Sequence, residues 1–441
     1  MPSKEIFCNS PWYELQIYWD GSYSFCCAED HKPYPEDQSH IYNVRNMSIR
    51  SWFDSEPMRQ ARSMMFGQTR NSACKNCYVE EDNSASSRRH RCNQKSVIFT
   101  RGNFFESYLQ SPHYPKFDHS NNHQGAYDGM PVDLHIDLGN YCNLTCKMCV
   151  PEASSSIAVQ YVKWGIESAK QYVGTDWTRD SVVWNRVLDE LLEIPNLKNI
   201  HFMGGETLIT PKFEEFVDFM LAHRRTDLHF SFVTNGTKFN AGLMKKLTQF
   251  KRVGIEVSIE STTKHNAYQR QGTDTDMVLQ NIEKYIALSN NNITVTIRPA
   301  IGLLTIGYYH TLLRYCLEKK LLIKGLIVYD PSYFEIKLLP ENIKQQYQLK
   351  YQELIKEFAL DQENIYADYN ESDPHQVKRV IANQAIQCIN LLSTPAPADS
   401  ETQLNDMVAW CRRWDQVHKY NALELYPELA DIFVKHGYTQ A

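Results

Sequence analysis

The stretch Asn140-Tyr-Cys-Asn-Leu-Thr-Cys-Lys-Met-Cys149 places three cysteines, Cys142, Cys146 and Cys149, in the spacing C-x3-C-x2-C. Three thiolates on one short loop can hold three irons of a [4Fe–4S] cluster and leave the fourth iron open to a small molecule. A structural zinc site normally has four ligands, and no fourth Cys or His stands close to this triplet in the sequence. The spacing of a simple ferredoxin is also missing. The loop therefore predicts an iron–sulfur cluster with one open iron.

Composition and charge limit the classes of protein that need to be considered. The chain has 441 residues, of which 42% are hydrophobic and 22% charged, an ordinary globular composition. Its formal net charge of −6 argues against a general nucleic-acid binder, because such proteins carry a basic surface. No apolar run is long enough to span a membrane and the first residues lack a secretory signal pattern, so we expect a cytoplasmic protein. Twelve cysteines in such a chain indicate metal ligands rather than disulfides.

Short apolar, β-branched runs alternate with helix-period segments from residue 131 onward. This alternation predicts parallel βαβ units. Six such units indicate an open, partial (β/α)6 barrel, in which the chemistry lies at the carboxyl ends of the strands. The predicted strands are Val132–Leu138, Asn199–Met203, Leu228–Val233, Val253–Ile259, Ile293–Arg298 and Leu326–Tyr329.

The predicted fold class of the whole chain is α/β, with additions on both sides of the barrel. Residues 1–92 are turn-rich and hold six of the twelve cysteines, which predicts a small Cys-rich α+β module. Residues 93–130 are polar and aperiodic, as in a linker or a covering loop. The barrel is assigned to 131–340 and a helical region to 341–441. Three further cysteines fall on apolar helical stripes and are expected in the core: Cys316, Cys388 and Cys411.

Polar residues follow the predicted barrel strands. The second strand ends in Met203-Gly-Gly-Glu206, where the glycines allow close backbone approach and the carboxylate can bind an ammonium group. The third ends in Thr234-Asn235-Gly236-Thr237, and the fourth carries Ser258 and Glu260, with Arg270 beyond it. Because a barrel directs the carboxyl ends of its strands into one space, we expect these groups to face the space that the cysteine triplet faces.

Together these motifs resemble the radical S-adenosylmethionine (SAM) superfamily, over roughly residues 131–335. In that family a cysteine triplet holds a [4Fe–4S] cluster whose open iron binds SAM, and one electron cleaves SAM to methionine and a 5′-deoxyadenosyl radical that abstracts a substrate hydrogen. The resemblance implies that Cys142, Cys146 and Cys149 are the cluster ligands. Met148 stands where an aromatic residue is common in the family, and a polarizable Met can also pack on a ring. SAM contacts are implied for Gly204, Gly205, Glu206, Thr234, Asn235, Ser258 and Arg270.

Two carboxylates are candidates for a direct catalytic role. Asp137 lies in the first barrel strand and Glu260 at the end of the fourth, and an ionisable group that faces a barrel site is a functional candidate. Glu260 is the stronger candidate of the two for the substrate side.

A second cysteine set lies near the amino terminus. Cys8, Gly21 and Cys26 are spaced C-x12-G-x4-C, and Cys74-Lys-Asn-Cys77 follows. This pattern resembles the twitch module, a shortened relative of the SPASM domain of radical SAM enzymes, here placed before the barrel instead of after it. The resemblance implies that Cys8, Cys26, Cys74 and Cys77 hold an auxiliary [4Fe–4S] cluster. A structural zinc site remains an alternative for these four thiols.

Two amino-terminal cysteines are left without a role. Cys27 could compete with Cys26 as a ligand. Cys92 follows the basic run Arg88-Arg-His-Arg, which favours a solvated loop over a ligand.

The expected function is that of a radical SAM enzyme with an auxiliary cluster, supplied with electrons by a donor such as flavodoxin or ferredoxin. We expect an oxidative modification of a peptide or protein, or of a small molecule. One alternative is a redox-neutral epimerase or rearrangement enzyme, for which Cys27 or Cys92 could donate hydrogen. The other is a non-catalytic iron–sulfur regulatory or binding protein.

Overall fold

The computed structural model describes residues 6–29, 32–67, 69–82, 87–90, 92–93, 123–174, 176–289, 292–359 and 376–439. The chain forms two compact units whose segments alternate along the sequence. Unit 1 comprises Met1–Tyr141, Gln171–Phe232 and Gly242–Val253, and unit 2 comprises Cys142–Lys170, Val233–Ala241 and Gly254–Ala441. The division at residues 92, 130 and 340 stays a prediction, and residues 94–122 of the expected linker lie outside the described residues.

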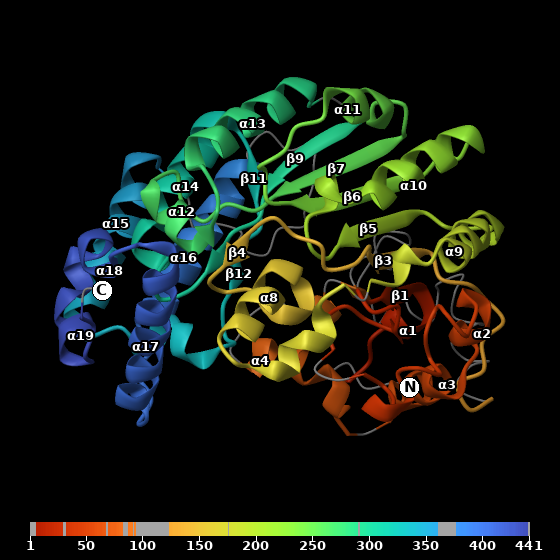
Figure 1. Cartoon of the computed structure of the whole chain (residues 1–441), viewed down its shortest axis with the longest axis horizontal. Helices are drawn as coiled ribbons and strands as arrows, with labels where there is room; N and C mark the ends of the chain where they lie inside the picture. The colour runs from red at the N-terminus through yellow and green to blue at the C-terminus, as the bar shows by residue number, and fades with distance from the viewer. Residues whose placement is uncertain are drawn as a thin grey trace. The chain divides into compact units, whose positions relative to one another are not determined.

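Unit 1 is built on a largely parallel sheet in the order β2-β1-β3-β5-β6 (Figure 1). Neighbouring β1, β3, β5 and β6 run parallel, and only β2 is antiparallel to β1. The registers include Leu15↔Leu134 and Ile136↔Phe202. Apolar residues alternate with polar ones along these strands, which explains why β3, β5 and β6 could be predicted from the sequence. The strands are β1 (Glu14–Ile17), β2 (Tyr23–Ser24), β3 (Asp133–Asp137), β5 (Asn199–Met203) and β6 (His229–Thr234).

The first two strands form a hairpin within the Cys-rich segment. Gly21 has φ +85°, and a Cβ there would lie 2.7 Å from Val44 Cγ2, so the turn requires glycine. The hairpin is not confined to a separate module, because β1 pairs with the first barrel strand, β3.

Apolar helix faces cover the unit 1 sheet. Helix α9 begins at the N-cap Asp180, whose carboxylate accepts hydrogen bonds from the Val182 and Val183 amides. Phe216 of α10 packs 4.7 Å from Phe202 of β5, measured between ring centroids. The helices are α1 (Ser10–Tyr13), α2 (Ile49–Phe53), α3 (Glu56–Met64), α4 (Lys75–Asp82), α9 (Ser181–Glu193), α10 (Pro211–Ala222) and α11 (Ala241–Leu247).

Unit 2 carries strands β7 (Arg252–Val257), β9 (Ile293–Ile297) and β11 (Leu322–Ile323), in the order β7-β9-β11. The prediction of the sixth barrel strand at Leu326–Tyr329 is wrong. The chain instead pairs Leu322–Ile323 with β9, turns, and pairs β12 (Leu326–Ile327) with β10 (Ala300–Ile301) in a separate two-stranded sheet. Two short apolar runs lie side by side in the sequence, and only tertiary pairing distinguishes them.

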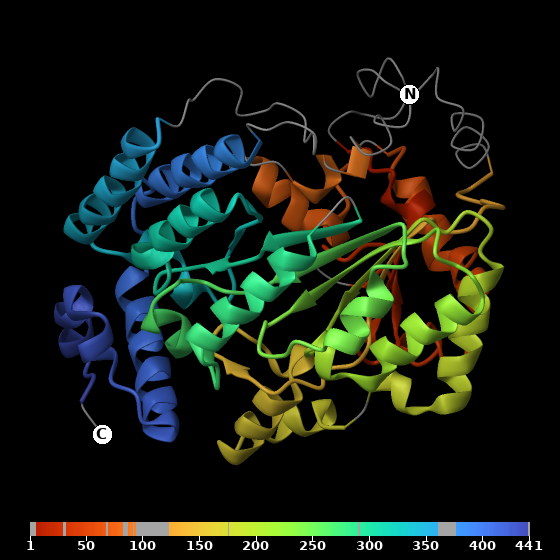
Figure 2. The same ribbon diagram turned by 90° about the horizontal axis from the view of Figure 1, so that it is seen from above.

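The helical carboxyl-terminal region is part of unit 2. Helices α15 and α16 lie side by side (Figure 2). Cys316, Cys388 and Cys411 are buried in α14, α16 and α17, as expected of core residues. The helices are α8 (Ser155–Lys163), α12 (Lys264–Gln269), α13 (Thr275–Leu288), α14 (Ile306–Lys319), α15 (Glu341–Glu357), α16 (Gln376–Leu392), α17 (Ser400–His418), α18 (Ala422–Leu425) and α19 (Ala430–Lys435).

This architecture confirms the predicted fold class: an α/β chain with a parallel-dominated sheet, consistent with a partial barrel, and added carboxyl-terminal helices. In the part of the chain that the structure describes, no helix has the length and apolarity needed to cross a membrane.

Candidate cluster sites

The cysteine triplet lies in unit 2 on a loop that is held from both sides. On one side β4 (Thr145–Cys146) pairs antiparallel with β8 (Arg270–Gln271), with Cys146 opposite Arg270. On the other side the start of α8 is tied to the loop, because Ser156 Oγ donates to the Cys142 carbonyl at 2.6 Å. The hydroxyl of its N-cap, Ser154, donates to the Leu144 carbonyl. The loop that carries the three thiols is therefore anchored at its middle and at its start.

Arg270 lies beside the triplet and is paired with Glu260. Its Nε and Nη2 lie 2.6 and 2.7 Å from the two Glu260 carboxylate oxygens, and Nη1 lies 4.0 Å from Cys146 Sγ. Burial alone would lower the pKa of Arg270, but the Glu260 charge outweighs burial and raises it. The carboxylate of Glu260 is buried and also accepts the Ala300 amide at 3.2 Å. Glu260 thus holds Arg270 in place, a contact that the sequence does not indicate.

The Arg270 charge partly offsets the effect of burial on the pKa values of two triplet thiols, Cys146 and Cys149. Burial raises the pKa of Cys149 to about 12, and the neighbouring Cys142 adds to that effect. Burial also raises the pKa of Cys146, while the Arg270 charge lowers it. Thiolates are the form that binds metal. Three soft donors on one loop beside a guanidinium fit an anionic iron–sulfur cluster.

One of the expected SAM-contact residues, Asn235, is hydrogen-bonded to the triplet loop within unit 2. Asn235 Nδ2 donates to Asn143 Oδ1 at 2.9 Å, and Asn143 Nδ2 donates to Thr237 Oγ1 at 3.1 Å. The Thr234 carbonyl accepts the Ser258 amide at 2.8 Å. The structure therefore brings Thr234, Asn235 and Ser258 together. Asn143 is not among the residues predicted from the sequence, although an amide between two ligand positions is a usable signal.

The Gly-Gly-Glu segment lies in unit 1 and packs on the residues just before the triplet. Gly205 has φ +54°, and a Cβ there would lie 2.2 Å from the Tyr141 carbonyl oxygen. The Glu206 amide donates to that same oxygen at 2.8 Å. Glu206 is buried, and its Oε1 accepts the Leu208 amide. Gly204 has φ +82° and is equally crowded by Gly139. Both glycines are thus required by close backbone packing.

Asp137 ends β3 in unit 1, beside Gly204. Burial raises the pKa of Asp137 to about 7, a hydrogen bond from Gln16 opposes the rise, and the Asp20 charge adds to it. A carboxyl with a pKa near neutrality can exchange protons at physiological pH.

The four expected auxiliary ligands lie in unit 1 and share one electrostatic environment. Cys8, Cys26, Cys74 and Cys77 are all buried. Burial raises the pKa of Cys74 to about 12 and that of Cys77 to about 11, and the charge of Cys26 adds to both. A hydrogen bond from Cys27 lowers the pKa of Cys26 to about 6 despite burial, and Arg88 contributes. These thiols are within electrostatic range of one another, as the ligands of a shared cluster would be.

Single-ion geometry is a separate question. No group of three or more Cys, His, Asp or Glu side chains among the described residues is arranged to hold one metal ion. The cysteines of a cubane cluster bind different irons, so they stand farther apart than the ligands of one zinc.

Cys92 belongs to this environment, which corrects the expectation of a solvated loop. Its side chain is 4% exposed, and Sγ donates to Glu14 Oε1 at 3.3 Å. Glu14 also binds Arg88 Nη2 at 2.9 Å, so the basic run is drawn inward by a buried carboxylate. Cys92 also hydrogen-bonds the Cys8 thiol. This bond lowers the pKa of Cys8, but burial and neighbouring thiols raise that pKa overall.

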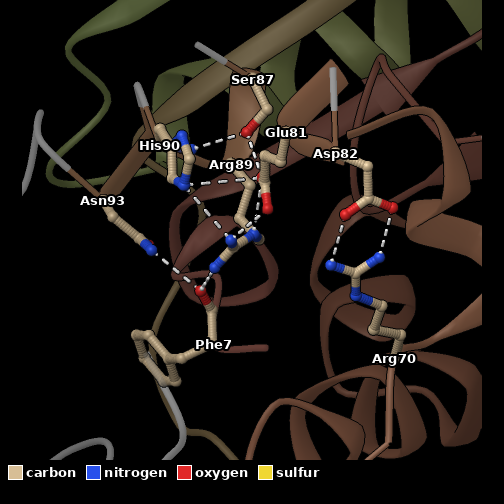
Figure 3. A network of polar contacts seen from close by, with 8 residues as sticks. All are labelled: Phe7, Arg70, Glu81, Asp82, Ser87, Arg89, His90 and Asn93. Atoms are coloured by element: carbon tan, nitrogen blue, oxygen red, sulfur yellow. Dashed lines mark hydrogen bonds and ion pairs between the residues drawn. The ribbon is translucent and has the colours of Figure 1, made fainter. Parts of the chain in front are cut away.

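A polar network fastens this segment to the backbone beside Cys8 (Figure 3). Arg89 Nη1 and Asn93 Nδ2 both donate to the Phe7 carbonyl, at 3.1 and 2.8 Å. Arg89 Nε also donates to Glu81 Oε1 at 3.0 Å, and Glu81 lies one turn beyond Cys77 in α4. The network therefore joins the Cys92 segment to two segments that carry proposed ligands, Cys8 and Cys77.

Family comparison assigns a domain type to each of the two segments that carry the cysteine sets. Residues 136–314 match the model of the radical SAM superfamily, and residues 8–78 match that of an iron–sulfur cluster-binding domain, SPASM. The chain therefore contains a radical SAM domain and a SPASM-type iron–sulfur domain. Its SPASM-type domain precedes the radical SAM domain, as the cysteine spacing predicted. These two domain types imply a SAM-binding [4Fe–4S] cluster and an auxiliary iron–sulfur cluster.

The individual proteins that this chain resembles differ from it strongly in sequence. A GTP 3′,8-cyclase of Streptomyces coelicolor is 28% identical over 131 residues, 30% of this chain and 33% of the cyclase. The structure of Streptococcus suis SuiB bound to the precursor peptide SuiA is 11% identical, covers 68% of this chain and 64% of SuiB, and has a TM-score of 0.36. The structure of anSMEcpe with bound AdoMet is 20% identical over 52% of this chain and 60% of that one, with a TM-score of 0.39. The chain thus spans a third of the curated relative and less than two thirds of the solved ones.

Proposed function

We propose that this protein cleaves SAM reductively and uses the resulting 5′-deoxyadenosyl radical to abstract a hydrogen atom from its substrate. The observation that carries the proposal is the anchored triplet loop together with Arg270, whose Nη1 lies 4.0 Å from Cys146 Sγ. When bound, the cluster supplies the electron that breaks the C5′–S bond of SAM. The chain's own groups then bind and orient SAM.

Each expected SAM contact has a defined role in this proposal. Gly204, Gly205 and Glu206 receive the amino group of SAM, because their backbone is held in one conformation by Gly139 and Tyr141. Arg270 Nη1 is directed toward the triplet, while Nε and Nη2 are engaged by Glu260. The Nη1 side of the guanidinium can therefore receive the SAM carboxylate, while Glu260 holds the Nε and Nη2 side in position. Ser258, Thr234 and Asn235 are the further SAM contacts in this proposal.

The radical SAM reaction is tested by measuring 5′-deoxyadenosine. Anaerobically loaded protein with dithionite and SAM should form 5′-deoxyadenosine, because three anchored thiolates leave one iron open for SAM. The variant Cys146→Ala should form none, since it removes the middle ligand of the triplet. Cys388→Ala serves as the control, because Cys388 is buried in α16 away from the proposed ligands. A fully loaded protein that yields no 5′-deoxyadenosine contradicts the proposal.

For the net reaction we propose an oxidation of a peptide or protein substrate, with the auxiliary cluster accepting the substrate electron. Flavodoxin or ferredoxin is the proposed donor for SAM cleavage. The supporting observation is the buried four-cysteine set of unit 1, whose thiols influence one another electrostatically. The product should lack two hydrogens relative to the substrate.

A redox-neutral epimerisation is the second candidate, and Cys92 is the observation that favours it. Its buried thiol is oriented by Glu14 and could return a hydrogen atom to a substrate radical. In deuterated water an epimerase incorporates deuterium into the product through this thiol, and Cys92→Ala abolishes the incorporation. An oxidising enzyme incorporates no deuterium, and its product lacks two hydrogens of the substrate.

A further inference from the structure

Lys147 stands between two proposed cluster ligands, Cys146 and Cys149, yet its side chain is completely buried. The ammonium group enters the carboxyl-terminal helices of unit 2. Its Nζ lies 3.3 Å from Asp415 Oδ1 of α17 and 3.9 Å from the centre of the Tyr268 ring. The Trp414 ring of α17 is a second aromatic neighbour, at 5.3 Å. A cation on the triplet loop is thus enclosed by an anion and two rings.

Asp415 is itself held by three other donors. Its Oδ2 accepts the Tyr438 hydroxyl at 2.6 Å, the Tyr268 hydroxyl at 3.1 Å and the Ala422 amide at 3.1 Å. These donors come from the carboxyl-terminal turn, α12 and the start of α18. The carboxylate therefore cannot follow Lys147 if the loop shifts, because four elements determine its position.

The backbone of Lys147 is fixed as well. Its amide donates to the Gln269 carbonyl at 2.9 Å, which continues the pairing of β4 with β8. Residue 147 is therefore immobilised at its main chain by α12 and at its side chain by α17. The thiols of Cys146 and Cys149 lie one residue before it and two residues after it.

An ion pair with 0% and 3% exposed side chains is a costly way to gain stability alone, because both charges lose their hydration. Apolar residues of similar volume would often be as stable. The ion pair adds geometric specificity, because a charge-assisted contact limits the position of the loop more narrowly than apolar packing does.

We propose that Lys147 and Asp415 are positioning residues of the SAM-binding cluster, so that α17 and α18 form part of the radical SAM site. The inference rests on the proposed function, because it takes Cys146 and Cys149 as ligands. It gives the carboxyl-terminal region a specific task, which is to keep these thiols at the spacing that the cluster requires.

The test uses the full-length protein loaded with iron and sulfide, and measures bound iron together with the EPR spectrum of the reduced clusters. Lys147→Met removes the cation and keeps the aliphatic stem, and Asp415→Asn removes the anion with little change of shape. Each single variant should lose most of the SAM-cluster signal and its response to added SAM, because each leaves one buried charge unpaired. The auxiliary signal should remain, since its cysteines belong to unit 1.

The double variant Lys147→Met/Asp415→Asn should recover the SAM-cluster signal in large part, because neither charge is left alone. Glu401→Gln is the control, because Glu401 of α17 pairs with Lys435 of α19 on the exposed surface. It should leave both signals unchanged.

The outcomes separate the inference from the function on which it rests. Wild-type protein that holds no triplet cluster overturns the proposed function. A wild-type triplet cluster that persists in both single variants, or that is lost in parallel with the auxiliary cluster, overturns the inference. A double variant no better than the single variants also overturns it.

Discussion

At the scale of single residues, the Gly-Gly-Glu motif is limited by backbone geometry before any ligand binds. Gly205 has a positive φ and faces the Tyr141 carbonyl at a distance no Cβ can tolerate. The segment Asn140–Tyr141 leads directly into the triplet. A distortion at Gly205 would therefore displace the start of the loop that carries the cysteines.

Gly205→Ala should lower the free energy of unfolding by about 1–3 kcal/mol from backbone strain, with a further loss from the clash. Chemical unfolding of the variant measures this change. Gly165→Ala is the matched control, since Gly165 has φ +81° but a Cβ added there would have no atom within 4 Å. Equal losses for the two variants would show that the contact with Tyr141 is unimportant.

Glu260 illustrates how structure changes a residue's assignment. The sequence suggests a catalytic carboxylate, whereas the structure shows it engaged with Arg270 through two contacts. A catalytic role stays a prediction, and a role in holding Arg270 is now the more direct one.

Glu260→Gln should destabilise the protein by about 3–5 kcal/mol, because it leaves the Arg270 cation without its buried partner. SAM affinity should fall with it. The Arg314–Glu357 pair has the same chemistry on the surface, with side chains 39% and 49% exposed. Glu357→Gln should therefore change the stability little, because solvent screens an exposed pair. Thermal unfolding of the two variants compares them, and similar losses would contradict the buried role.

At the scale of elements, β1 connects the Cys-rich segment to the barrel strands. It pairs with β3 over four residues, from Glu14↔Asp133 to Ile17↔Ile136. On its other side β3 pairs with β5. The first barrel strand is thus an interior strand of the unit 1 sheet and not an edge.

A chain that begins at residue 123 should aggregate or stay unfolded, because β3 would present an uncovered edge. Soluble yield and limited proteolysis measure this. Cys8→Ala/Cys74→Ala removes auxiliary ligands but keeps β1, so it should remain folded. If the shortened chain folds and loads its triplet, β1 is dispensable.

Apolar residues at every second position allowed the strands β3, β5, β6, β7 and β9 to be predicted from the sequence, because this alternation is typical of a strand. The last strand was misplaced, since Leu322–Ile323 and Leu326–Ile327 have the same local pattern and differ only in their partners. The pairing of β1 with β3 left no local signal at all.

At the scale of the whole molecule, the chemistry of the sites was easier to predict than their supports. Cysteine spacing and Gly-Gly-Glu identified both cluster types because metal ligation requires particular residue types at particular intervals. The supports are single polar residues such as Asn143, Lys147 and Glu14, whose partners are distant in sequence. Arg88 and Arg89 looked solvated for the same reason, since their carboxylate partners could not be located from the sequence.

The pairing of β1 with β3 has a consequence for biosynthesis. Glu14 is registered against Asp133, a separation of 119 residues (133 − 14). The strand that leaves the ribosome first must therefore wait for one made much later, and closing so long a loop is slow. Cys8 and Cys26 flank that waiting strand. The segment that carries these two thiols therefore reaches its final sheet pairing only after the first barrel strand has been made.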